Sequence, residues 1–175
     1  MYPEEYIMFL VHFHGDRDYF ECHEILEDYW KRTPSPVRSS IWVGLIQLAV
    51  ALYHQRRQNF AGAVKLLSSA IEIVNSDPAG IQKLGLDPHA LQSQLKDRLA
   101  DMHQQKPYTS MNLPITDPDL LAACQQRCTE QGFTFGQPSE LTNAYLLDKH
   151  KLRDRSEVIA ERNRSLLAKR KAKEL

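Results

Sequence analysis

Residues 41–53 read IWVGLIQLAVALY, and Gln47 is the only side chain among them that carries an amide or a charge. The run is shorter than the roughly 20 residues that cross a bilayer. A helix that is apolar on every side belongs at the centre of a helical bundle. The segment therefore predicts a central buried helix, and with it an all-α fold.

Apolar residues recur at helical spacing on both sides of this segment. A capping residue followed by proline marks three helix starts, at Ser35-Pro36, Asp87-Pro88 and Asp117-Pro118. Gly15 suits a left-handed helix end between the first two helices. The pattern predicts helices over residues 4–14, 17–32, 36–57, 59–75, 88–105, 118–131 and 139–170.

These helices predict a single-domain helical bundle with three parts. Residues 1–105 form its core, residues 106–137 a connector with one helix packed on that core, and residues 138–175 a charged C-terminal helical extension. Small residues gather where the third and fourth predicted helices would cross, which is typical of a tetratricopeptide-like hairpin. No second copy follows at the required period, so we do not expect a solenoid.

The composition fits one globular domain, since 42% of the 175 residues are hydrophobic and 25% are charged. The net charge of zero gives no global field that would draw in nucleic acid or an anionic membrane, so we expect neither as a partner. Three cysteines cannot all pair within the chain, and the N-terminus lacks a basic signal segment. Both features predict a cytoplasmic protein with reduced core thiols.

The balanced charge hides an asymmetry along the chain. From Asp148 to Leu175, ten Lys and Arg residues oppose five Asp and Glu residues, whereas the residues before Trp30 are rich in Asp and Glu. The long C-terminal helix has only one apolar position per heptad, which is half of a coiled-coil seam. We therefore expect this helix to contact a protein partner or a second copy of the chain.

A polar cluster is expected between the second and third helices. His23 and Glu27 lie four residues apart and share one helix face, and Glu24 precedes Glu27 by three residues. Gln47 and His54 lie two turns apart on the third helix, and a lone amide among apolar residues needs a hydrogen-bond partner. The candidate residues are His23, Glu24, Glu27, Trp30, Gln47, His54 and Arg57, with His14 as a further candidate.

Three interpretations of this cluster stay open. In the first it is a buried polar network that fixes helix register, with Glu27 paired to Arg57 or His54. In the second, His23, Glu27 and His54 bind a divalent metal such as zinc, iron or manganese. In the third, Glu24 or Glu27 has a shifted pKa and serves a metal-free ligand or acid–base site. The segment His-Glu-x-x-Glu lacks the second histidine of the zinc-protease motif His-Glu-x-x-His.

The segment from His23 to Trp30 fits the pattern His-Glu-x-x-Glu-x-x-Trp. It is followed by Gly44-Leu-Ile-Gln-Leu-Ala-Val-Ala-Leu-Tyr-His54 and then by Arg57, Asn59 and Gly62. Over about residues 13–75 the chain resembles the prokaryotic domain-of-unknown-function family 309. The resemblance implies a small all-helical bundle and supports the location of the candidate site, and it implies that the basic tail is an extension found in part of the family.

The sequence leaves two functional hypotheses and does not decide whether the protein is an enzyme. The favoured one is a non-catalytic binding or scaffold protein, with a polar His/Glu cluster between the second and third helices and a hairpin groove for a partner. The alternative is a divalent-metal-binding protein or metal-dependent enzyme that uses His23, Glu27 and His54.

Overall fold

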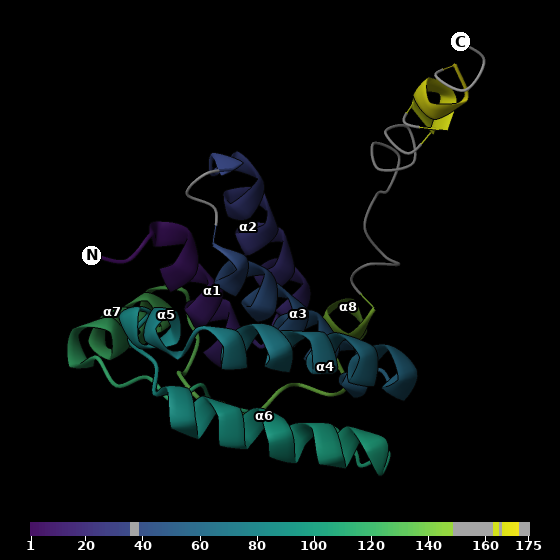
Figure 1. The fold of residues 1–175 in the computed structure, drawn as a ribbon. Coiled ribbons are helices and arrows are strands. Elements are labelled where there is room, and N and C mark those ends of the chain that lie inside the picture. The colour runs from purple at the N-terminus through teal and green to yellow at the C-terminus, as the bar shows by residue number, and fades with distance from the viewer. Residues whose placement is uncertain (36–38, 149–162, 165, 172–175) are drawn as a thin grey trace.

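The centre of the fold is α3 (Ser40–Arg56), which packs between α2 (Tyr19–Arg32) and α4 (Phe60–Ser76) (Figure 1). The structure is a computed structural model, and it describes residues 1–35, 39–148, 163–164 and 166–171. Leu45, Leu48 and Leu52 of α3 are fully or almost fully buried. The apolar segment therefore forms the predicted central helix.

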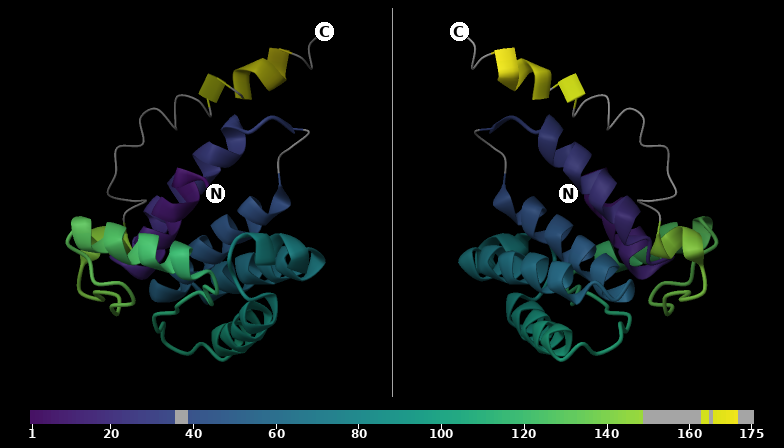
Figure 2. Two further views of the ribbon diagram at one scale, coloured as in Figure 1. Left: turned by 90° about the vertical axis from the view of Figure 1, so that its left-hand side faces the viewer. Right: turned by 90° about the vertical axis from the view of Figure 1, so that its right-hand side faces the viewer.

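The remaining helices surround this layer. α1 (Glu4–His14) packs on α2 and on α7 (Pro118–Glu130), while α6 (Pro88–His103) lies along α4 (Figure 2). Two short helices, α5 (Pro78–Lys83) and α8 (Ala144–Leu147), complete the set among the described residues up to residue 148. Apart from one isolated bridge between Leu86 and Ile115, that part of the chain contains no extended pairing, so the predicted all-α bundle is confirmed.

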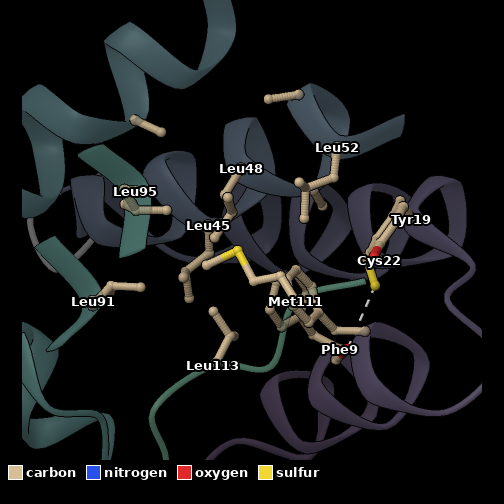
Figure 3. Packing of buried hydrophobic residues seen from close by; sticks show 14 of the residues in the cluster. Phe9, Tyr19, Cys22, Leu45, Leu48, Leu52, Leu91, Leu95, Met111 and Leu113 are labelled. Carbon is tan, nitrogen blue, oxygen red and sulfur yellow. Dashed lines mark hydrogen bonds between the residues drawn. The ribbon is translucent and has the colours of Figure 1, made fainter. Parts of the chain in front are cut away.

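The core joins α3 to both flanking layers and to the connector after α6. Figure 3 shows leucines of α3 and α6 facing Met111 and Leu113, which come from the connector that crosses the bundle. Cys22 is buried in the same cluster, and its thiol donates to the Phe9 carbonyl at 3.4 Å. All three cysteines are free and buried, which confirms that they are core thiols.

The α3–α4 hairpin depends on close packing of small residues. A Cβ on Gly44 would lie 3.0 Å from the Ile73 side chain, and Ala63 and Ala70 on the facing helix are fully buried. Such close contacts leave no room for larger residues at the crossing. The arrangement agrees with the expected tetratricopeptide-like pair.

Aspartates cap the helices that begin with proline. The carboxylates of Asp87 and Asp117 accept hydrogen bonds from the first-turn amides of α6 and α7, as predicted. Asp77 does the same for α5, accepting from the Gly80 amide at 2.9 Å. The sequence analysis did not predict α5, although Asp77-Pro78 carries the same signal.

Three boundary predictions need correction. α3 begins at Ser40, not at residue 36, because the Ser39 hydroxyl accepts from the Ile41 amide and caps the helix there. Gly15 has a φ of −89°, so it is not left-handed; a Cβ there would lie 2.6 Å from the Val11 carbonyl oxygen and 2.8 Å from the Phe133 ring. Close approach, not handedness, explains this glycine.

The helix predicted over 139–170 is the third correction. Its first turn is absent: residues 139–143 are not helical, the Asn143 amide donates to the Glu140 carbonyl in a turn, and the Asn143 side chain caps the short α8. Residues 149–162 lie outside the described residues, and helix is present again at 163–164 and 166–171. Among the helices of the described part of the chain, none has the length and apolar character needed to cross a membrane.

Candidate functional site

His23 of α2 and His54 of α3 line one pocket. The pocket has a volume of about 160 Å³, and its other lining residues are mainly aromatic or aliphatic: Tyr19, Phe20, Val50 and Tyr53. On α2, Tyr19 and Phe20 lie one helical turn before His23. On α3, Val50 lies one turn before Tyr53 and His54. Each helix therefore presents one face to the pocket. We call this the α2–α3 pocket. The structure thus brings together the two histidines that the sequence analysis had paired.

The imidazole of His23 lies among carboxylates at the edge of the pocket. Its Nε2 is 3.0 Å from Glu27 Oε2, and its Nδ1 is 3.7 Å from Glu24 Oε1. Lys31 Nζ contacts the other oxygen of Glu27 at 3.0 Å. His23 and both glutamates are partly exposed, so solvent screens these contacts and each contributes little to stability.

The tautomer of His54 follows from its neighbour Asn59. The Asn59 carbonyl oxygen caps α4 by accepting from the Gly62 amide, so its NH₂ group faces His54 Nδ1 at 3.2 Å and donates to it. Burial lowers the pKa of His54, and the nearby Arg57 charge lowers it further. A neutral His54 therefore carries its proton on Nε2 and offers that N–H as a donor.

Trp30, Gln47 and Arg57 do not join the two histidines. Glu27 pairs with His23 and Lys31, not with Arg57, whose guanidinium binds Asp148 at 2.9 Å and lies over the Tyr53 ring. The side-chain oxygen of Gln47 is buried and has no hydrogen-bond partner in the described part of the structure. Trp30 packs against the hydrophobic core. The predicted network that would satisfy Gln47 is therefore not formed.

His14 belongs elsewhere. It is fully buried, its Nδ1 donates to the Leu10 carbonyl at 2.8 Å, and its Nε2 accepts from the Leu113 amide at 2.9 Å. Its ring stacks on Phe135. Burial lowers the pKa of His14 to about 4, so the side chain is a neutral link between α1 and the connector.

Within the described residues, no group of three or more His, Cys, Asp and Glu side chains is arranged to hold a metal ion. His23 faces carboxylates through both ring nitrogens, and His54 Nδ1 is already bonded to Asn59. A zinc, iron or manganese ion bound by His23, Glu27 and His54 would have to displace the present contacts of all three side chains. The metal site stays a prediction.

The sequence analysis missed a second polar centre of buried arginines. Arg17, Arg56 and Arg98 are each at least nine-tenths buried. Arg98 donates to the Gln55 side chain and to the Thr109 carbonyl. No periodic pattern identifies these residues, because their partners are distant in sequence. Arg56 follows the last residue of the apolar segment, Tyr53, by three positions, and this closeness is the one sequence feature that favours its burial.

The fold and the pocket define an all-α bundle with a histidine pair between two consecutive helices. The model of the family described as "Domain of unknown function (DUF309)" matches residues 6–66. The chain is also 47% identical over 174 residues to "Uncharacterized protein YpuF" of Bacillus subtilis (strain 168), a match that covers 99% of this chain and 100% of that protein. The chain therefore belongs to the DUF309 family. No solved structure matches it significantly.

These comparisons bear on the location of the candidate site and on the C-terminal extension. The family match includes the whole of α2 and α3, and so every residue that lines the α2–α3 pocket. The YpuF relative matches almost the full chain, so it shares the C-terminal extension beyond the family core.

Proposed function

We propose that this protein is a non-catalytic binding protein that captures an apolar side chain of a protein partner in the α2–α3 pocket. The observation that carries the proposal is the pocket itself, an open site with walls built from Tyr19, Phe20, Val50 and Tyr53. Large apolar or aromatic side chains that fill such pockets supply most of the energy of protein interfaces.

The size of the pocket favours a single side chain over a free metabolite. Small-molecule sites commonly measure about 300–1,000 Å³, whereas a cavity of about 150 Å³ accommodates benzene. The α2–α3 pocket, at about 160 Å³, matches one aromatic or branched aliphatic group. A partner would therefore contribute one anchor residue, with the rest of the contact outside the pocket.

The polar groups at the edge define what surrounds that anchor. Glu24 and Glu27 lie beside His23 and are partly exposed, and neutral His54 offers an Nε2–H donor. A polar rim around an apolar centre is typical of protein interfaces. The acidic rim favours a partner segment with a Lys or Arg residue near its apolar anchor.

The alternative, a metal-binding protein or metal-dependent enzyme, receives less support from the same geometry. Each ring nitrogen of His23 faces a carboxylate, and Asn59 holds His54 in the tautomer whose Nε2 is protonated. Metal coordination requires an unprotonated ring nitrogen. Both histidines would have to exchange their present partners before they could bind an ion.

Filling the pocket tests the proposal. We expect indole and p-cresol, as probes of the anchor, to cause saturable NMR shifts of the His23, Tyr53 and His54 signals. Val50→Trp should abolish these shifts, because its indole occupies the space that the probe would take. Lys65→Trp places the same side chain on the exposed face of α4 and should leave the shifts unchanged.

Thermal unfolding of both variants checks that the fold is retained. Equal probe shifts in the parent and in Val50→Trp, or no saturable shift in the parent, would contradict the proposal.

A further inference from the structure

A second pocket, of about 420 Å³, lies where the turn between α1 and α2 meets the connector and the segment after α7. Its wall includes the side chains of Arg17, Tyr108, Ser110, Asn112 and Ser139. Its volume falls within the range of small-molecule sites. We call it the arginine pocket, and it shares no lining residue with the α2–α3 pocket.

Arg17 lines the arginine pocket and is only 1% exposed. Its guanidinium donates to three carbonyls, of Phe13, Met111 and Gln137, and to the side-chain oxygen of Asn112. These bonds use four of its five N–H groups. Its φ is 58°, a conformation that residues other than glycine rarely adopt and that is common at binding and catalytic sites.

Arg56 adds a second buried charge directly behind the wall. It is 7% exposed, and its guanidinium donates to the Arg17 carbonyl at 2.7 Å and to Ser139 Oγ at 2.9 Å. A third bond goes to the Leu146 carbonyl, and the guanidinium lies 4.7 Å from the centre of the Tyr19 ring. Its Nε is buried and has no hydrogen-bond partner in the described part of the structure.

The acceptors that the described residues offer to both guanidinium groups are all uncharged. Buried charges are ordinarily paired with an opposite charge, because removal from water is costly. The buried Asp18 caps α2 by accepting from the Glu21 amide. The two guanidinium charges outnumber this one carboxylate, and they lie beside an open pocket whose wall carries the hydroxyls of Ser110 and Ser139.

We propose that the arginine pocket binds a small molecule through an oxyanion group, a carboxylate or a phosphate. The anion adds a negative charge beside Arg17 and Arg56, whose hydrogen-bond acceptors among the described residues are uncharged, and the hydroxyls of Ser110 and Ser139 donate to its oxygens. This site goes beyond the proposed capture of an apolar side chain, and its ligand is of a different chemical class.

The test introduces a carboxylate into the wall. Ser139 contacts Arg56 and lines the pocket, so the carboxylate of Ser139→Asp occupies the position of the ligand anion. Ser139→Asn has nearly the same shape without the charge and is the matched control. The full chain is titrated with sodium phosphate and, separately, with sodium acetate, at an ionic strength held constant with sodium chloride. The readout is the NMR shift of the Ser110 and Asn112 amides.

We expect saturable shifts in the parent and in Ser139→Asn, and an affinity at least about tenfold weaker in Ser139→Asp, since like charges repel at close range. Ser139→Asp should also raise the Tm by about 2–4 °C without any added anion. Binding of phosphate alone assigns a phosphoryl ligand, and binding of acetate alone assigns a carboxylate.

The proposal is overturned if neither anion causes a saturable shift, or if the shifts persist undiminished in Ser139→Asp. If Ser139→Asp does not fold, Ser110→Asp provides the same test from another part of the wall.

Discussion

Replacing Arg17 with methionine should lower the free energy of unfolding by about 3–5 kcal/mol, the largest loss that we expect from a single substitution. The methionine keeps the apolar stem and removes the guanidinium. Four acceptors, three backbone carbonyls and the Asn112 side chain, then lose their donor in a buried environment. An unsatisfied buried acceptor costs about 1–3 kcal/mol. Denaturation in urea, followed by circular dichroism, measures the change.

Arg17→Gly separates the hydrogen bonds from the backbone conformation. Glycine loses the same four bonds but adopts a φ of 58° without strain. Relief of that strain stabilises the folded state by about 1 kcal/mol. Alanine at this position loses the same four bonds and the same buried stem as glycine but keeps the strain, so Arg17→Gly should be about 1 kcal/mol less destabilised than Arg17→Ala. A loss below about 1 kcal/mol in Arg17→Met would show that the guanidinium does not hold the connector and the following segment to α1.

The stability of the protein should fall by about 3 kcal/mol as the pH decreases from 6.5 to 4, because of His14. Burial lowers the pKa of His14 to about 4 in the folded chain, whereas its ordinary value is 6.5. Between these values the unfolded chain binds a proton that the folded chain excludes. The stabilisation is therefore complete above pH 6.5 and is lost as the pH falls to about 4.

Neighbouring histidines act in distinguishable ways. Burial lowers the pKa of His12, but its hydrogen bond to Asp16 and the nearby carboxylates outweigh burial, so the pKa is raised. The stabilisation that His12 provides is therefore lost as the pH rises above 6.5. The pKa of His54 is lowered, and it adds to the effect of His14 in the same pH range. Denaturation across this range in His14→Gln should show a shallower dependence on pH than in the parent. An NMR titration in which His14 ionises near pH 6.5 would contradict the account.

Most of the fold could be predicted because helical periodicity and capping are local properties. The predicted helix over 4–14 has the same bounds as α1, and the Asp-Pro signals locate the starts of α6 and α7. α5 was missed because its six residues are too few to show a period. The start of α3 was misplaced because Ser35-Pro36 carries the expected signal, whereas Ser39 provides the actual cap.

The candidate sites differ in how far the sequence reveals them. His23 and His54 could be paired in advance because they lie on consecutive helices that pack against each other. The arginine pocket could not be predicted, since Arg17 contacts residues 94–120 positions away and its carbonyl partners have no residue-specific signature. For Gln47 the sequence suggested a contact that the structure does not contain. Its buried side-chain oxygen was expected to have a hydrogen-bond partner, and none is present among the described residues.

The central claim is that the α2–α3 pocket holds an apolar side chain of a protein partner. Photo-crosslinking in cells from benzoylphenylalanine at Glu24, a partly exposed position beside His23 at the edge of the pocket, tests it most directly, with Lys65 as the control position. We predict one discrete partner crosslinked from position 24 and not from position 65, with the adduct next to an apolar side chain of the partner. Its replacement by alanine should weaken binding by about 2 kcal/mol or more. Equal crosslinking from both positions, or an alanine variant that binds as tightly as the original partner, would contradict the claim.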